Sequence, residues 1–172
     1  MQGILYHYLA DDHDRLDRLL REAAGAPGTI DKQPYAGFRK GLLRHIAMEE
    51  KIVLPMIAQQ KNAAVAAVTG RIRLDHGALV ALLVPPPTGS IVATLQSILS
   101  VHNSLEEKEG GLYEVFEGLA GPDADAVLGK LRSIPDVPVV PHNERPEVLE
   151  ATRRAVARAG HEFKEAAGGA DE

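Results

Sequence analysis

Residues 45–51 read His-Ile-Ala-Met-Glu-Glu-Lys, and residues 102–108 read His-Asn-Ser-Leu-Glu-Glu-Lys. Each copy places a histidine and a glutamate four residues apart, which on a helix puts both side chains on one face, one turn apart. A second repeated pattern precedes each copy: residues 12–16 read Asp-His-Asp-Arg-Leu and residues 75–79 read Asp-His-Gly-Ala-Leu. The chain therefore contains the same pair of patterns twice.

The spacing between the two copies indicates a duplicated helical hairpin. A repeat of about sixty residues is too long for a solenoid. Four helices that each carry an inward histidine or glutamate are the arrangement that builds a metal site in the core of a bundle. We therefore expect an all-α protein, with an antiparallel up-down-up-down four-helix bundle and extra C-terminal helices.

The amino-acid composition limits which metals and which partners the chain could bind. The chain has 172 residues, 45% of them hydrophobic, which suits one domain with a real core. It contains no cysteine, so imidazole and carboxylate must hold any metal, and these donors suit iron, manganese or zinc. A net charge of −5 argues against nucleic-acid binding. Neither a signal peptide pattern nor an apolar run of about 20 residues occurs, so we expect a cytoplasmic protein that does not enter a membrane.

Apolar periodicity predicts four long helices, over residues 4–24, 33–61, 62–84 and 88–119. Pro55 should kink the second helix just after its His-Glu pair, and Gly110-Gly111 could loosen the fourth. Thr88 or Ser90 can cap the fourth helix.

The C-terminal part is predicted to continue with a short helix over 124–133, capped by Asp123, and an extended connector over 135–146. A last amphipathic helix over 146–166 should follow, and the final five residues should fray. We expect residues 1–120 to form the bundle. Residues 121–172 should form a helical extension that packs on the bundle or at a subunit interface.

The histidines should meet at one depth in the bundle. His13 lies about eleven residues before the end of its helix and His45 about eleven after the start of the next, so each is roughly 16 Å from their shared turn. The distances of His76 and His102 from the turn that joins their own two helices agree to within about one helical turn. A lone histidine on an apolar stripe is usually a core residue with one hydrogen bond. We expect His7, His142 and His161 to be such core residues or to lie on the surface.

Two glutamates favour a metal site over a set of ordinary core histidines. Burying Glu49 and Glu106 without partners would cost several kcal/mol, and metal coordination removes that cost. The neighbouring Glu50 and Glu107 should face outward or contact the outer side of a ligand. The candidate metal ligands are His13, His45, Glu49, His76, His102 and Glu106.

These six residues, in this order, resemble the hemerythrin-like, HHE cation-binding family, as does the Glu-Glu-Lys-Ile-Val-Leu-Pro sequence of residues 49–55. The resemblance covers about residues 3–119. It implies two non-haem iron ions bridged by Glu49 and Glu106, with zinc or manganese as alternative metals. It further implies that His13 and His102 hold one iron, and that His45 and His76 hold the other.

The sequence departs from the oxygen-carrying hemerythrins. They have a fifth histidine in a His-x-x-x-His pair on the third helix, but Ile72 and Val80 occupy the candidate positions here. Their fourth helix uses His-x-x-x-x-Asp rather than His-x-x-x-Glu. The ligand set is closer to the iron–sulfur repair di-iron proteins and to the iron-sensing hemerythrin domains.

Three interpretations of function stay open. The first is a di-iron protein that binds or reacts with oxygen, nitric oxide or peroxide, in sensing, detoxification or iron-centre maintenance. The second is an iron-responsive metal-binding domain without turnover, and the third is a plain bundle with incidental histidines. Whether the protein is an enzyme is left open, and a homodimer is one expected assembly.

Two tyrosines mark an expected direction of access. Tyr6 lies seven residues before His13 and Tyr113 seven after Glu106, so both should fall at one end of the site. Leu20, Phe38, Leu83 and Leu95 should close the opposite end. Either tyrosine could donate a hydrogen bond to a bound small ligand, or both could simply fill the core and bond to backbone.

Overall fold

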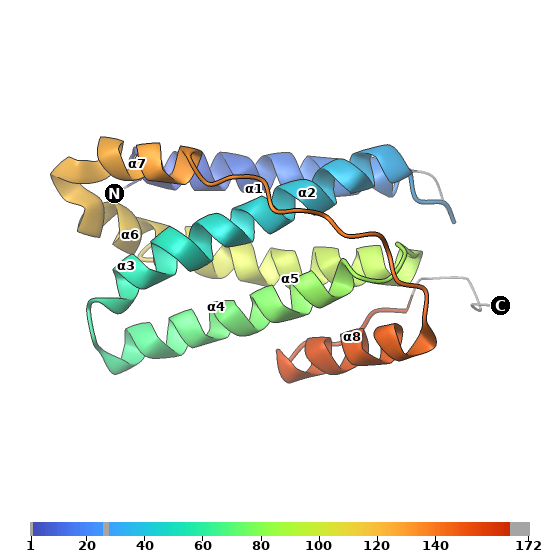
Figure 1. Cartoon of the computed structure of the whole chain (residues 1–172). Coiled ribbons are helices and arrows are strands. Elements are labelled where there is room, and N and C mark those ends of the chain that lie inside the picture. Colours follow the sequence, from blue (N-terminus) through green and yellow to red (C-terminus); the bar gives the residue numbers. More distant parts are fainter. Residues whose placement is uncertain (1, 26–27, 166–172) are drawn as a thin grey trace.

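The computed structural model describes residues 2–25 and 28–165, and this part of the chain is helical with no β-strand (Figure 1). The all-α prediction is confirmed. Four long helices lie side by side in Figure 1: α1 (Ile4–Ala23), α2 (Lys32–Met48), α4 (Ala63–Leu82) and α5 (Gly89–Glu107). The shorter ones are α3 (Leu54–Ala58), α6 (Leu112–Ala120), α7 (Ala124–Arg132) and α8 (Pro146–Arg158).

Side-chain caps begin several of these helices. The side chain of Asn62 accepts a hydrogen bond from the Val65 N–H at the start of α4, and Thr88 accepts one from Ile91 at the start of α5. Thr88, one of the two caps that the sequence left open, is therefore the one used. Asp123 precedes α7 but makes no side-chain cap bond, because the 3₁₀ turn η2 (Gly121–Asp123) leads directly into that helix.

The second predicted helix is interrupted rather than simply kinked. A π-helical turn, η1 (Glu49–Val53), separates α2 from α3, and Pro55 lies in the first turn of α3. Proline has no N–H and its ring crowds the carbonyl four residues earlier, so a wider turn before it relieves both problems. The interruption begins at Glu49 itself, and helical structure ends at Ala58 instead of residue 61.

The fourth predicted helix is wrong beyond residue 107, where α5 ends and the chain turns before α6. Gly110 has φ +70°, in the left-handed region that favours glycine. A Cβ on Gly111 would lie 2.6 Å from the carbonyl oxygens of Glu106 and Lys108, so this tight turn requires glycine. The turn directs α6 against α1 and α3 and buries Tyr113 completely.

Two apolar clusters fill the interior, and the predicted ligands lie between them. One cluster includes Leu20, Phe38, Leu83 and Leu95, the four residues expected to close one end of the site. The other includes Tyr6, Tyr113 and Phe116. Along each long helix the histidine separates a residue of one cluster from a residue of the other: Leu9 and Leu16 in α1, Leu42 and Met48 in α2, Ile72 and Leu79 in α4, and Ile98 and Leu105 in α5.

The C-terminal part packs along the long helices. α7 contacts α1, a connector without regular structure follows over residues 134–145, and α8 contacts α4 (Figure 1). The last helix ends at Arg158 rather than residue 166, because Gly160 adopts φ +77° and reverses the chain. The final five residues, expected to fray, lie outside the described residues. The division at residue 120 stays a prediction.

No helix in the described ranges combines the length and apolarity that crossing a membrane requires.

Candidate metal centre

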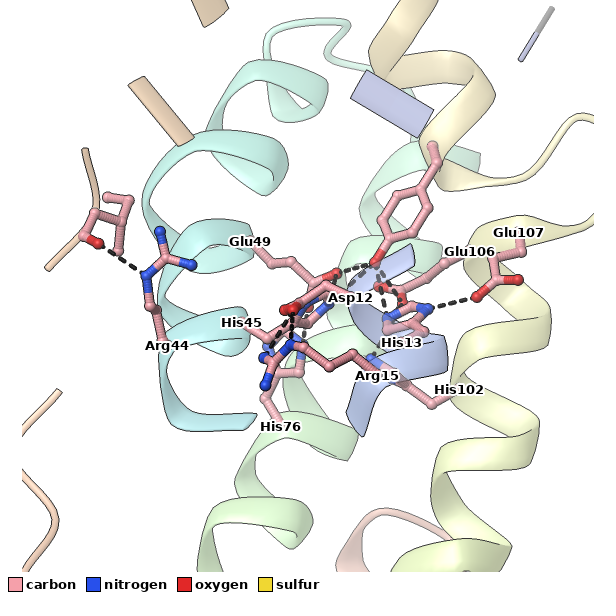
Figure 2. A network of polar contacts seen from close by, with 12 residues as sticks. Asp12, His13, Arg15, Arg44, His45, Glu49, His76, His102, Glu106 and Glu107 are labelled. Atoms are coloured by element: carbon pink, nitrogen blue, oxygen red, sulfur yellow. Dashed lines mark hydrogen bonds and ion pairs between the residues drawn. The ribbon is translucent and has the colours of Figure 1, made fainter. Parts of the chain in front are cut away.

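The structure brings all six predicted ligands into one buried layer (Figure 2). Each side chain is at most 4% exposed, and both carboxylates are fully buried. The residues come from consecutive long helices and the π turn: His13 from α1, His45 from α2, Glu49 from η1, His76 from α4, and His102 and Glu106 from α5.

The inner ring nitrogens face the two carboxylates. Nε2 of His45 lies 3.3 Å from Oε1 of Glu49, and Nε2 of His76 lies 2.9 Å from Oε2 of the same residue. Nε2 of His13 and of His102 each lie 3.4 Å from Oε2 of Glu106. Each carboxylate therefore lies between histidines of both hairpins, which is the position that a bridging ligand needs.

The potential donor atoms fall into two groups within 4.8 Å. One group contains His13, His45 and Glu49, and the other contains Glu49, His76, His102 and Glu106. This grouping differs from the pairing that the resemblance implied, His13 with His102 and His45 with His76. Neighbouring helices of one hairpin bring their histidines together, with ring centroids 4.5 Å apart for His13 and His45 and 5.1 Å for His76 and His102.

A carboxylate faces the outer nitrogen of every ligand histidine. Within each hairpin an aspartate does so: Asp12 lies 2.9 Å from Nδ1 of His45, and Asp75 lies 3.5 Å from Nδ1 of His102. Between the hairpins a glutamate does so: Glu50 lies 2.7 Å from His76 Nδ1 and Glu107 2.5 Å from His13 Nδ1. Glu50 and Glu107 thus contact the outer sides of ligands, one of the two predicted alternatives.

Sequence reasoning missed Asp12 and Asp75. Their signal was the duplicated Asp-His pair, which was read as part of the repeat without a role for the aspartate. A carboxylate that accepts from Nδ1–H holds the neutral imidazole in the tautomer whose Nε2 lone pair points inward. The three contacts of hydrogen-bonding length therefore aim Nε2 of His13, His45 and His76 at the same buried space, and Asp75 faces His102 at the longer distance of 3.5 Å.

The electrostatics of this layer are compatible with a bound cation. Burial, followed by the charge of Glu49, raises the pKa of Glu106 well above its ordinary value. Burial alone would also raise the pKa of Glu49, but His45 and His76 hold it well below its ordinary value. Oε1 of Glu106 is buried and has no hydrogen-bond partner among the described residues. A metal ion would satisfy that oxygen and neutralise both carboxylates, so the donor set fits a bound metal.

Residues 4–84 match the family model of the hemerythrin HHE cation binding domain. The resemblance to this family is confirmed. The match contains His13, His45, Glu49 and His76, whereas His102 and Glu106 lie beyond it and join the site through the geometry described above. No curated protein and no solved structure matches the chain. Residues 4–84 are thus similar to a hemerythrin HHE cation-binding domain, and the described residues contain a histidine and glutamate cluster that could bind metal.

One further side chain, that of Tyr113, enters the cluster. The hydroxyl of Tyr113 lies 2.6 Å from Oε1 of Glu49 and 3.2 Å from Oε2 of Glu106. It also lies 3.0 Å from Nε2 of His13 and 3.2 Å from Nε2 of His45. Burial and then the charges of Glu106 and Glu49 raise the pKa of this phenol well above its ordinary value.

The two tyrosines therefore differ. The break after α5 brings Tyr113 back toward the ligands, whereas the spacing predicted it two turns away along one continuous helix. Tyr6 instead donates a hydrogen bond of 2.9 Å to the backbone carbonyl of Glu107, as the core-filling reading predicted for both.

A cavity of about 350 Å³ lies between α1 and α5 and borders the cluster at His13. Its lining includes His13 and Glu107, together with the polar side chains of Ser100, Asn103 and Ser104.

Proposed function

We propose that the chain is a non-haem di-iron protein that binds or reacts with oxygen, nitric oxide or peroxide. In this proposal α1, α2, α4 and α5 form the antiparallel up-down-up-down bundle of the family. His13 and His45 would hold one iron, His76 and His102 would hold the other, and Glu49 and Glu106 would be shared between them. The observation that carries it is the convergence of four inward-facing nitrogens on two fully buried carboxylates.

The donor chemistry supports a transition metal. Imidazole nitrogen with carboxylate oxygen suits iron, with zinc and manganese as alternatives, while calcium and magnesium prefer oxygen alone. Six donors shared between two ions leave positions for a small ligand on each. When bound, the metals would supply Lewis acidity and, as iron, electrons for reaction with that ligand.

The chain's own residues would prepare the site for such a ligand. The four outer carboxylates fix the imidazole rings, and the apolar clusters on both sides exclude bulk water from the layer. The hydroxyl of Tyr113 has a single proton to donate, and it lies close enough to serve a ligand placed between the carboxylates. The polar cavity beside His13 supports entry of small molecules from the α1/α5 side.

A second candidate, an iron-responsive domain without turnover, is favoured by one specific contact. His161, in the segment after α8, lies 2.8 Å from Asp75, which itself faces the ligand His102. Such a contact links the metal layer to the C-terminal part. Turnover of peroxide or nitric oxide by iron-loaded protein separates the candidates, because only the first expects it.

The test of the proposal combines metal content with spectroscopy. Protein produced with iron should contain about two irons per chain. Its oxidised form should show near-ultraviolet charge-transfer bands that change when azide is added. Folded protein without metal, under the same growth conditions, would leave only a plain bundle with incidental histidines. The homodimer and the cytoplasmic location stay predictions.

A further inference from the structure

The segment that follows α8 reaches the metal layer from outside the bundle. Nε2 of His161 lies 2.8 Å from Oδ1 of Asp75, which is fully buried. The other carboxylate oxygen of Asp75 lies 3.5 Å from Nδ1 of His102. One aspartate on α4 therefore lies between a ligand on α5 and a histidine of the C-terminal part.

Local backbone chemistry places His161 there. The His161 N–H donates to the carbonyl of Val156, and the Gly160 N–H donates to that of Ala157. With Gly160 at φ +77°, these two bonds form the Schellman motif that ends a helix. The residue after the glycine then has a fixed position, and in this chain that residue is His161.

The contact between His161 and Asp75 distinguishes the outer support of His102 from that of the other three histidines. The outer carboxylates of His13, His45 and His76 lie 2.5–2.9 Å from Nδ1, compared with 3.5 Å for Asp75 and His102. Asp75 also pairs with Arg71 at 3.2 Å, and the same Arg71 nitrogen lies 2.9 Å from Nε2 of His161, so the three side chains form one cluster. Within the described residues, Nδ1 of His102 and Oδ2 of Asp75 lack a hydrogen bond of ordinary geometry. Asp75 is therefore shared, and His102 has the weakest support of the four.

Other bonds dock the same segment on the two helices that carry His76 and His102. The hydroxyl of Thr152 in α8 donates to the carbonyl of Ala81 in α4, at 3.1 Å. The N–H of Lys164 donates to Thr94 Oγ1 in α5, at 2.9 Å. Val156 and Ala159 are buried in the apolar cluster that also holds Leu79 and Ile98. The C-terminal segment thus spans the second hairpin next to its ligands.

We infer that His161 is a positioning residue for the metal held by His76 and His102, acting on His102 through Asp75. The inference rests on the proposed metal site. Metal binding at that position and docking of the C-terminal segment then stabilise each other, because coupling between two binding events is reciprocal. The position held by His13 and His45 has no such contact in the described structure and should be insensitive to it.

The test measures the affinity of each metal position by competition with a chelator in His161→Phe and His161→Gln. Phe keeps a ring of similar size without a donor, whereas Gln keeps an N–H at similar reach. We expect the weaker of the two dissociation constants to rise by up to about 10-fold in His161→Phe, the lower end of the effect of losing a direct outer partner because His161 acts one residue further out, and to recover in His161→Gln. His142→Phe, in the connector, is the matched control and should bind like wild type.

Limited proteolysis of the connector provides a readout that needs no activity. Metal should slow cleavage within residues 134–145 in the wild type and have little effect in His161→Phe. Wild-type affinity and wild-type metal protection in His161→Phe would overturn this inference alone. Wild-type protein that binds no metal would overturn the proposed function and this inference with it. Failure of His161→Gln to recover would overturn the claim that His161 acts through a hydrogen bond to Asp75.

Discussion

Replacing Glu106 by glutamine should change the metal-free and metal-loaded proteins in opposite directions. The side chain is fully buried, and one of its oxygens has no partner among the residues described. Glutamine keeps the shape and removes the ionisation that burial and Glu49 oppose. Because glutamine carries no charge, the metal-free variant should gain about 1–3 kcal/mol at pH 7, comparable to the desolvation penalty of a buried group. At about 2–4 °C per kcal/mol, its melting temperature should rise measurably.

The loaded variant should lose a bridging carboxylate, so its metal content should fall and at least one ion should bind about 100-fold more weakly. The assay is thermal melting with and without metal, together with metal analysis. The pKa of Glu106 is higher in the folded protein than in the unfolded chain. The metal-free wild type therefore loses stability as the pH rises above the ordinary pKa of a glutamate. The gain from glutamine should therefore vanish near pH 4.

Glu107→Gln is the matched control, because Glu107 is 34% exposed and contacts only the outer nitrogen of His13 in this cluster. It should weaken metal binding less and should not stabilise the metal-free protein. A metal-free Glu106→Gln variant that melts lower than wild type, or a loaded one that retains all its metal, would refute the reasoning.

Three further outcomes are expected. Burial opposes charge on His45, but Glu49 and Asp12 raise its pKa to about 9. The stabilisation of metal-free protein by charged His45 is complete below about pH 6.5 and should disappear as pH rises through about 9. Melting curves across this pH range would show the loss. Bound metal should make the melting temperature less dependent on pH. Chelation at pH 7 should lower the melting temperature by several degrees or more, and an unchanged value would argue against a shared buried site. Tyr113→Phe should alter azide affinity at constant metal content, whereas Tyr6→Phe should match wild type; identical titrations for both would make Tyr113 a core residue only.

The repeated patterns made much of the site predictable from sequence. In each of two helices, a histidine and a glutamate lie one turn apart on the apolar face. Such a face packs inward, so these side chains must meet inward side chains of the other helices. Helix length then determines the depth at which those groups meet. For this reason the six residues converge where the periodicity of α1, α2, α4 and α5 indicated.

The remaining features depend on tertiary contacts that periodicity does not encode. The turn at Gly110-Gly111 was visible as a weak point, but only packing of α6 on α1 and α3 sends Tyr113 into the site. The role of Asp12 depends on which helix lies next to α1, and that of His161 on where α8 docks. Spacing along one helix cannot show which neighbour a side chain on its edge will meet.

The central claim is that four histidines and two buried glutamates hold two metal ions. Elemental analysis of protein produced with iron tests it most directly, with Glu49→Ala and Glu50→Ala measured alongside. The account expects about two irons per wild-type chain, a sharp loss in Glu49→Ala, and a small loss in Glu50→Ala. Folded wild-type protein without metal, or a larger loss in Glu50→Ala than in Glu49→Ala, would contradict it.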